Sequence, residues 1–286
     1  MPDPAVARRL PDGRLHLQHG PIDLVVEAFG TRDAVAGAYR AAARCFPAIL
    51  PALVGELAVL RAPIRSETPN PRGPVARRMA SAVRPHLPAF VTPMAAVAGA
   101  VADHVLAAMT ADRHLVRAYV NNGGDIALHL DPGERLVAGM VGRLDRPRPD
   151  GRIVVDAAMP VRGVATSGRA GRSFSLGIAD AVTVLAPTAA AADAAATLIA
   201  NAVDTDHDRI ERAPARDLDP DSDLGDLPVT VAVGALDPAA VDLALRRGAA
   251  AAEAMRRRGL IHGAVMVLRG RCRVVGTTPI ALANAA

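Results

Sequence analysis

The segment AYVNNGGDIALHL, residues 118–130, contains a turn that also has the features of a ligand site. Apolar runs flank Asn122-Gly123, a dipeptide that is strongly favoured in two-residue hairpin turns. Gly124 adds a second residue without a Cβ, so a ligand can come close to the backbone, and Asp125 adds a carboxylate. Spacing alone fits an ordinary hairpin and also fits a ligand site built on a hairpin.

A second candidate lies on the predicted helix at 94–109. Gly99, in the middle of this pattern, costs about 1 kcal/mol of helix stability relative to alanine. Asp103 follows four residues later and therefore shares its face of the helix. The pattern fits a helix that packs closely over Gly99 with Asp103 at the solvent edge, and it also fits a ligand contact.

A third candidate is the segment 163–203. Thr166-Ser167-Gly168 offers two hydroxyls and a backbone N–H at the end of a predicted strand. On the helix that Thr188 is expected to cap, Asp193 and Thr197 are four residues apart and point to one side, where they could share a hard cation such as Mg²⁺. A solvated helix face is the alternative.

Composition limits the function classes. The chain has 286 residues, of which 51% are hydrophobic and 2% aromatic, so its core must consist of small aliphatic side chains. The longest apolar stretch is interrupted by Asp103 and His104, which argues against a membrane span. The N-terminus has no hydrophobic region behind its charges, so it does not resemble a signal peptide. The two cysteines are too few for a disulfide framework or a cysteine metal site. We expect a cytoplasmic protein that does not bind membranes.

The basic residues are all arginines. The 33 basic positions include no lysine, which excludes Schiff-base enzymes, pyridoxal phosphate enzymes and P-loop nucleotide sites. The net charge is +4, but the arginines are scattered and aromatic residues for base stacking are scarce. We therefore expect no nucleic-acid binding.

The element pattern predicts a single α+β domain over 1–286, with a mixed or antiparallel sheet and packed helices. We expect a hairpin at 14–30, a helix from Thr31 to about Leu60 that is broken near Pro47 and Pro51, and a loop at 61–74. Further predicted elements are a helix at 92–109, strands at 114–121, 125–130, 136–142, 153–156, 163–166, 180–186 and 228–234, helices at 188–204 and 237–258, a turn at 145–151, and a final hairpin at 262–276. The segment 205–226 is predicted to be an acidic loop and 279–286 a frayed tail.

The order of the motifs resembles the ApbE-like superfamily, whose best-known members are Mg²⁺-dependent flavin transferases. Such proteins carry K-G-x-x-x-D on a helix, N-x-G-G-D-I after a strand, a T-S-G turn, and A-D-A-x-x-T on a helix after a V-T-V strand. This chain shows AGAVAD at 98–103, NNGGDI at 121–126, TSG at 166–168, AVTVLA at 181–186 and ADAAAT at 192–197. The match covers about 92–204, and the whole chain resembles a shorter, T-fold-like branch of that superfamily.

The resemblance implies a flavin nucleotide ligand, FAD or FMN, with its diphosphate near Gly123 and Gly124. It implies that Asp193 and Thr197 hold Mg²⁺, and it leaves the catalytic residues unassigned. In the transferases FAD is split, FMN passes to a protein threonine and AMP leaves. The cofactor contacts implied by the resemblance are Gly99, Asp103, Asn121, Gly123, Gly124, Asp125, Thr166, Ser167 and Gly168.

Two departures from the family pattern concern the cofactor region. Ala98 replaces the helix lysine, and the segment H-x-x-D-P-x-x-G is absent, with Leu176 near the place of its histidine. The resemblance therefore leaves open a FAD-cleaving flavinyl or phosphoryl transferase, a flavin-binding or accessory protein of redox or sulfur (homocysteine-type) metabolism, and a protein for another small molecule. The physiological substrate, an acceptor or partner protein and a homodimer are open as well.

The acidic segment has its own two interpretations. Residues 205–226 contain eight acidic residues and three arginines, and the carboxylates at 217–226 lack the spaced glycine and terminal glutamate of an EF-hand loop. The segment is either a solvated loop or one that folds back over a nucleotide pocket.

Overall fold

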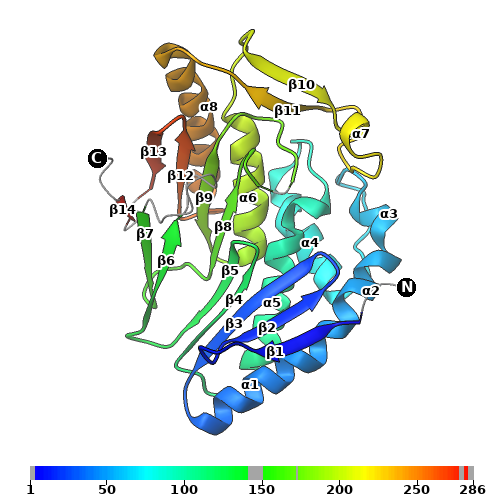
Figure 1. The fold of residues 1–286 in the computed structure, drawn as a ribbon, viewed down its shortest axis with the longest axis vertical. Helices are drawn as coiled ribbons and strands as arrows, with labels where there is room; N and C mark the ends of the chain where they lie inside the picture. The colour runs from blue at the N-terminus through cyan, green and yellow to red at the C-terminus, as the bar shows by residue number, and fades with distance from the viewer. Residues whose placement is uncertain (1–3, 141–150, 172, 277–279, 283–286) are drawn as a thin grey trace. The chain divides into compact units, whose positions relative to one another are not determined.

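The computed structural model describes the chain except for residues 1–3, 141–150, 172, 277–279 and 283–286 (Figure 1). Helices pack on antiparallel sheets, which confirms the α+β fold class. Two compact units, each assembled from three separate stretches of the chain, make up the structure. Unit 1 contains Met1–Leu136, Asp156–Ala165 and Ala186–Asp193, and unit 2 contains Val137–Val155, Thr166–Leu185 and Ala194–Ala286.

Unit 1 is built on an antiparallel meander in which each strand pairs with the next. The first part of β8 (Gly163–Ser167) pairs with the last strand of the meander through Gly163 and Val164. Burial alternates along these strands, so one face carries Leu24, Val26, Ala118 and Val120 into the core. The strands of the meander are β1 (Val6–Arg9), β2 (Leu15–His19), β3 (Ile22–Phe29), β4 (Arg117–Asn122) and β5 (Asp125–Leu130).

Helices cover this face because each has an apolar stripe. α1 (Arg32–Cys45) is capped by Thr31, whose hydroxyl accepts the N–H of Ala34 at 3.3 Å, and α5 (Val97–Thr110) packs against α1, β4 and β5. The other helices of unit 1 are η1 (Phe46–Ala48), α2 (Ile49–Gly55), α3 (Leu57–Leu60), α4 (Pro74–Val83), η2 (Arg84–His86) and η3 (Pro93–Ala96).

Unit 2 contains its own antiparallel sheet, in which β12 (Gly263–Leu268) pairs with β9 (Ala181–Ala186) on one side and with β13 (Arg271–Val275) on the other. α8 (Pro238–Arg257) packs on β12 and β13. A separate ribbon is formed by β10 (Ile210–Pro214) and β11 (Pro228–Val233), with α7 (Ala215–Leu218) between them. The three-stranded sheet has the order β14 (Ile280–Leu282), β7 (Gly151–Asp156), β6 (Arg135–Met140).

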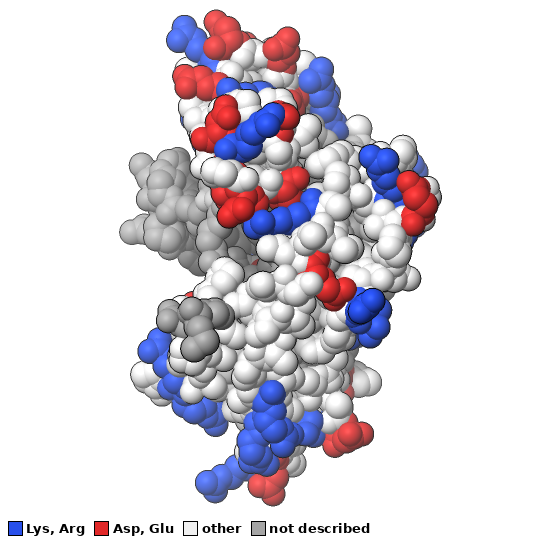
Figure 2. All heavy atoms as spheres, turned by 90° about the vertical axis from the view of Figure 1, so that its right-hand side faces the viewer, with Lys and Arg blue, Asp and Glu red and all other residues white. Residues whose placement is uncertain are grey.

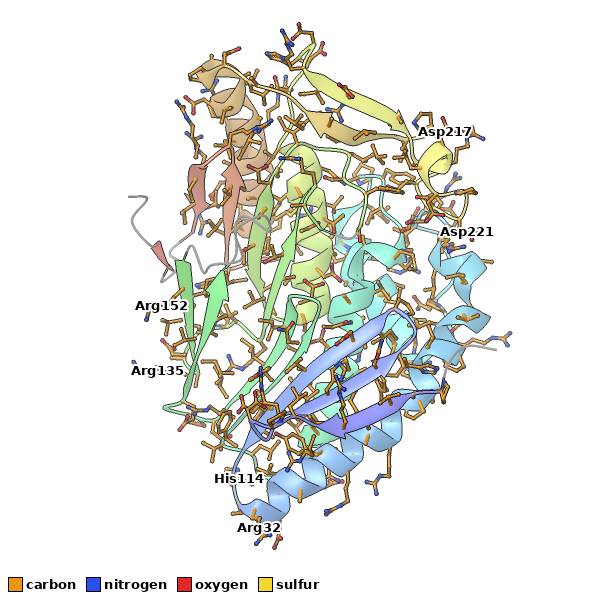
Figure 3. All side chains as sticks on the ribbon, viewed as in Figure 1. Arg32, His114, Arg135, Arg152, Asp217 and Asp221 are labelled. Atoms are coloured by element: carbon orange, nitrogen blue, oxygen red, sulfur yellow. The ribbon has the colours of Figure 1, made fainter. Side chains whose placement is uncertain are left out.

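Several predicted elements are correct and others are wrong in identifiable ways. The breaks at Pro47 and Pro51 divide the first helical region into α1, η1, α2 and α3, as expected. The sequence pattern predicts no element between residue 74 and residue 92, where the structure has α4. Arginines on this helix interrupt its apolar stripe in the sequence, although Val75, Met79 and Val83 are buried. The acidic segment 205–226 is not one loop, since it contains β10 and α7, and Figure 3 shows Asp217 on α7 and Asp221 in the loop that follows.

The predicted frayed tail is also partly wrong. Ile280–Leu282 pairs with Gly151–Ile153 as an edge strand, which a short apolar sequence does not reveal without its partner. Most of the predicted turn at 145–151 lies outside the described residues.

Among the residues that the structure describes, the helical region Pro93–Thr110 is long and apolar enough to cross a membrane by length and composition, and half of it is buried inside the protein. The core helix of a globular domain passes the same test, and α5 buries Val101, Val105 and Met109 against the meander and its neighbouring helices. The face drawn in Figure 2 carries both basic and acidic side chains.

Close packing at the start of α6 (Ala189–Ala202) depends on two glycines of unit 1. A Cβ on Gly99 would lie 2.3 Å from the carbonyl oxygen of Ala189, and one on Gly163 would lie 2.1 Å from the carbonyl carbon of Thr188. Both contacts are to backbone atoms, which cannot rotate away. The first turn of α6 therefore packs directly on the backbones of α5 and β8.

We predict that Gly99→Ala destabilises the protein by about 1–3 kcal/mol, because the overpacking cost exceeds the gain in helix propensity. Gly55→Ala is the matched control, since a Cβ at the end of α2 would have nothing within 4 Å. The urea midpoint measured by circular dichroism should fall for Gly99→Ala and stay the same or rise for Gly55→Ala. Equal midpoints for the two variants would contradict the packing argument.

Candidate functional site

Two aspartates of unit 1 each cap the helix that carries the other. Asp103, on α5, accepts the N–H groups of Ala189 and Ala190 at 3.0 and 2.9 Å, which begin α6. Asp193, on α6, accepts the N–H of Gly99 at 3.0 Å, at the beginning of α5. This reciprocal capping satisfies N–H groups that a helix start otherwise leaves unpaired, and it places both carboxylates at positive ends of helix dipoles.

The α6 cap is completed locally. Thr188 accepts the N–H of Ala191 at 3.1 Å, so the cap predicted from the sequence is present. Thr92, in contrast, makes no side-chain cap, and a 3₁₀ turn at Pro93–Ala96 precedes α5. Gly99 therefore lies in the first turn of α5 rather than in the middle of a helix, which explains how its N–H is available to Asp193.

The hairpin of the motif NNGGDI ends beside the start of α5. The buried Asn122 donates its side-chain N–H to the carbonyl of Ala98 at 3.1 Å. Asn122 pairs with Asp125, so the two turn residues are Gly123 and Gly124, one position later than Asn122-Gly123. Both glycines have positive φ, 64° and 114°, which a turn of this length demands.

The turn geometry leaves room for a ligand at one of these glycines. Gly124 donates its N–H to the side chain of Asn121 at 2.8 Å. A Cβ on Gly124 would have nothing within 4 Å, so positive φ and not crowding requires glycine there. The backbone at Gly124 is consequently approachable, as a ligand contact would require.

Burial dominates the electrostatics of the two capping carboxylates. The pKa of Asp193 is raised well above its ordinary value, first by burial and then by the charge of Asp125, against the opposing effect of the N–H groups of Gly99 and Ala98. Burial also raises the pKa of Asp103, although the N–H groups of Ala190 and Ala189 and the charge of Arg78 oppose it. The buried Asp125 belongs to the same unit.

An exposed helix cap shows the opposite shift. Asp237 accepts the N–H groups of Ala239 and Ala240 at 2.8 and 2.9 Å at the start of α8, and these bonds lower its pKa. The capping bonds are alike, so removal from water accounts for the reversed direction at Asp103 and Asp193. The unit 1 carboxylates are therefore held in an environment that would favour a bound cation or proton.

The structure brings together part of the predicted site residues. Gly99, Asp103 and Asp193 are joined by hydrogen bonds in unit 1, and Asp125 acts on Asp193 through its charge. Thr197 follows Asp193 by one turn of α6 and belongs to unit 2. Across the residues with assigned structure, no group of three or more His, Cys, Asp or Glu side chains is arranged to hold a metal ion.

The T-S-G turn lies in unit 2 at the end of β8. The hydroxyls of Thr166 and Thr183 are 2.9 Å apart, and Gly168 has a φ of 146°. A Cβ on Gly168 would lie 2.6 Å from the carbonyl oxygen of Asp180, so this turn also packs on backbone. Arg169, the next residue, pairs with the side chain of Asp180 at 2.8 Å.

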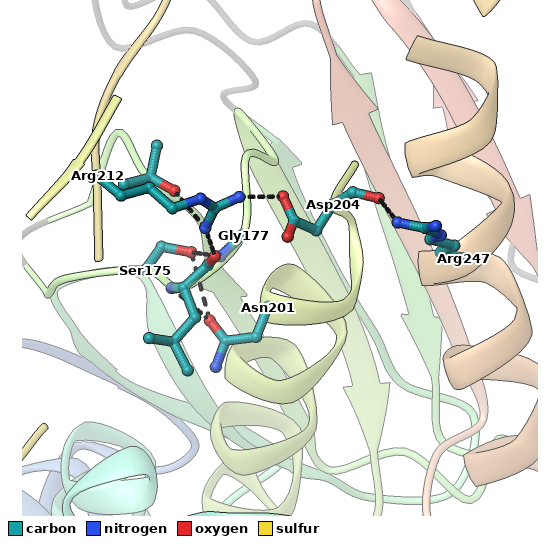
Figure 4. Close-up of polar contacts among 8 residues, drawn as sticks. Ser175, Gly177, Asn201, Asp204, Arg212 and Arg247 are labelled. Carbon is teal, nitrogen blue, oxygen red and sulfur yellow. Dashed lines mark hydrogen bonds and ion pairs between the residues drawn. The ribbon is translucent and has the colours of Figure 1, made fainter. Parts of the chain in front are cut away.

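Sequence reasoning missed a second polar network, which anchors the loop before β9 (Figure 4). Asn201, one turn of α6 after Thr197, accepts the N–H of Leu176 at 3.0 Å and is therefore a structural residue. Arg212 donates to the carbonyl of Leu176 and to Asp204, and Arg247 donates to the carbonyl of Asp204 at 3.1 Å. The sequence gives no signal for Arg212, because Leu176 is 36 residues away and its separation of eight residues from Asp204 fits no motif.

We predict that Asp193→Asn removes a pH-dependent loss of stability. Between about pH 4 and the raised pKa of Asp193, the folded protein holds a proton that the unfolded chain releases, so the free energy of unfolding falls as pH rises, by at most about 1.4 kcal/mol per pH unit. Asparagine stays neutral and resembles the protonated acid, so this fall should be smaller in the variant. Urea unfolding from pH 4 to 8 measures it, with the exposed Asp33→Asn as the control that should parallel the wild type. Parallel curves for all three proteins would show that the carboxylate of Asp193 is not destabilised by burial.

Comparisons with known proteins identify the family. The chain is 41% identical over 169 residues to a UPF0280 protein of Methanopyrus kandleri, a match that covers 58% of this chain and 64% of the relative. It is 36% identical over 124 residues to a UPF0280 protein of Methanococcoides burtonii, covering 43% of this chain and 51% of the relative. The matches thus span about half to two thirds of the length of these relatives.

Two solved structures are similar over more of the chain but at low scores. The first is the flavin transferase ApbE from Vibrio cholerae, with 18% identity, a TM-score of 0.35, and coverage of 88% of this chain and 77% of that one. The second is the apo form of the flavinyl transferase ApbE from Pseudomonas stutzeri, with 14% identity, a TM-score of 0.37, and coverage of 96% of this chain and 95% of that one. A family model described as "AbpE bacteria" matches residues 7–274. The chain therefore belongs to the AbpE bacteria family and is a member of the ApbE-like superfamily that its motifs resemble.

Proposed function

We propose that this protein binds a flavin nucleotide, FAD or FMN, together with Mg²⁺. The observation that carries the proposal is the reciprocal capping of α5 and α6, which gathers Gly99, Asp103 and Asp193 from two motifs 86 to 94 residues apart. Membership of the ApbE-like superfamily supports the choice of ligand class. We propose Gly99, Asp103, Asn121, Gly123, Gly124, Asp125, Thr166, Ser167 and Gly168 as its contacts.

The donor groups suit a magnesium ion. Mg²⁺ binds through one or two carboxylates, with water and substrate phosphates completing its shell, and does not need a cage of protein side chains. Asp193 is a carboxylate oxygen donor whose raised pKa reflects burial beside a second carboxylate, a situation that a cation relieves. We propose that Asp193 and Thr197 hold the ion, which would neutralise charge on phosphate oxygens.

Two activities are compatible with such a complex. A transferase would cleave FAD between its phosphates and pass FMN to an acceptor, releasing AMP, and phosphoryl chemistry of this kind demands mainly positioning and charge neutralisation from the protein. A flavin-binding or accessory protein of redox or sulfur metabolism would leave FAD intact. The absence of lysine favours the second activity, because arginine presents a planar fork where a lysine would present a compact ammonium.

We predict saturable quenching of FAD or FMN fluorescence by the purified protein, stronger with Mg²⁺ than without it. The chain has no tryptophan and two tyrosines, so intrinsic protein fluorescence is a poor signal and the flavin is followed instead. Asp193→Asn should weaken Mg²⁺-dependent binding about tenfold or more, equivalent to about 1.4 kcal/mol. Thr197→Val, which keeps the side-chain volume, should reduce the Mg²⁺ dependence without removing a helix cap.

The control is Asp33→Asn, an exposed carboxylate on α1, which should bind as the wild type does. Chromatography of the nucleotide after incubation decides between the two activities: FMN plus AMP indicates a transferase or hydrolase, and intact FAD indicates a binding protein. Failure of both flavins to bind, with or without Mg²⁺, would reject the proposed ligand.

A further inference from the structure

The residue that follows the T-S-G turn is held in place by an aspartate that no motif includes. Arg169 donates its Nε–H and an Nη2–H to one oxygen of Asp180, at 3.2 and 2.8 Å. Its backbone N–H donates to the carbonyl of Ala179 at 2.9 Å. The guanidinium is thus bound along one edge, by a carboxylate on the segment that leads into β9.

Asp180 is itself fixed. Its second oxygen accepts the N–H of Arg269 at 2.5 Å, in the turn between β12 and β13 (Figure 1), and its own N–H donates to Val267 at 2.9 Å. Arg269 adopts a φ of 51°, uncommon for a residue with a side chain, and its guanidinium donates to the carbonyls of Val233 and Gly234. The carboxylate that orients Arg169 therefore has little freedom to move.

The other side of Arg169 is available. A guanidinium has five N–H groups, and the pair with Asp180 uses two of them. In the part of the chain that the structure describes, the remaining Nη1 and Nη2 hydrogens have no partner, and 30% of the side chain is exposed. These hydrogens form the edge that binds phosphate oxygens in a bidentate manner.

The unused donors favour an anion. Asp180 balances the charge of Arg169 along one edge of the guanidinium, and the remaining N–H groups are a cationic donor set that only an acceptor can satisfy. Arg269 contributes its backbone N–H to Asp180, while its guanidinium binds the carbonyls of Val233 and Gly234. The packing of Gly168 on the Asp180 backbone sets the position of the turn before a ligand arrives. A preorganised donor of this kind loses less conformational entropy on binding than a free surface arginine.

We propose that Arg169 binds a phosphate group of the nucleotide ligand and that Asp180 is a positioning residue that orients it. The inference deepens the proposed function by assigning phosphate recognition at the T-S-G turn, and it rests on the proposed function only for the identity of the ligand as a flavin nucleotide. An ion pair with a purely structural role is the competing explanation.

The test uses inorganic pyrophosphate as the probe and isothermal titration calorimetry of the full chain at low ionic strength. We expect Arg169→Gln to weaken binding at least tenfold and Arg169→Lys to retain part of the affinity, because lysine keeps the charge and loses the fork. Asp180→Asn should weaken binding by a smaller factor. The matched control is Arg271→Gln, which breaks a comparable 2.7 Å ion pair with Asp242 in the same unit and should change affinity less than twofold.

Two results would overturn the inference. The first is that the wild-type protein does not bind pyrophosphate, and the second is that Arg169→Gln binds pyrophosphate as tightly as Arg271→Gln does. Tighter binding by Asp180→Asn would show that Asp180 competes with the anion, which would reject its positioning role. Circular dichroism checks that each variant is folded, and Arg169→Lys provides a second reading if the glutamine variant is not.

A comparison of FMN with riboflavin separates this inference from the proposed function. Riboflavin lacks the phosphate, so Arg169→Gln should weaken FMN binding and leave riboflavin binding unchanged, which a general loss of structure would not do. Arg169-dependent binding of pyrophosphate with no binding of either flavin would uphold the phosphate site and reject the flavin. Flavin binding that is independent of Arg169 would uphold the flavin as the ligand and reject the phosphate site at Arg169.

Discussion

The reciprocal capping of α5 and α6 by Asp103 and Asp193 is the interaction on which the candidate site depends. Each helix begins where the other supplies a carboxylate, so the N–H groups of Gly99, Ala189 and Ala190 lose their side-chain partners if the two helices separate. Gly99 and Gly163 make the exchange possible, because any side chain at either position would meet the backbone at the start of α6. The same contact fixes Ala98, to which Asn122 at the end of the motif hairpin is bonded.

Burying the capping carboxylates of Asp103 and Asp193 disfavours their charged forms, and this same property suits a site that binds a ligand. Capping bonds alone stabilise the charged form of an aspartate, as at the exposed Asp237. At Asp103 and Asp193 burial outweighs them and raises the pKa, and at Asp193 the charge of Asp125 adds to the effect. A protein that needed only two helix caps would gain more from exposed ones. Carboxylates kept in this strained electrostatic state are typical of sites that complete their charge balance with a ligand.

Because the chain has no lysine, its permanent positive charges are carried by arginine. Arginine binds flat, forked anions well but must be oriented, and an aspartate orients two of the arginines beside loops in this structure. Arg169 is held by Asp180, and Arg212, which anchors the loop at Leu176, is held by Asp204. The two pairs differ in the N–H groups that they leave unbound. The guanidinium of Arg212 donates to Leu176, Thr230 and Asp204, whereas the guanidinium of Arg169 donates to Asp180 along one edge only.

The sequence by itself determined the local structure and the family. Alternating apolar residues predicted the hairpins, Thr188 and Asp237 predicted helix starts, and five motifs in order indicated the ApbE-like superfamily. It did not determine the partners of the polar residues. Asp103 meets α6 across 86 residues and Asp180 meets Arg269 across 89, and no periodic pattern encodes such a pairing. Short edge strands such as β1 and β14 likewise depend on the neighbour that satisfies their backbone groups, so only the tertiary structure decided them.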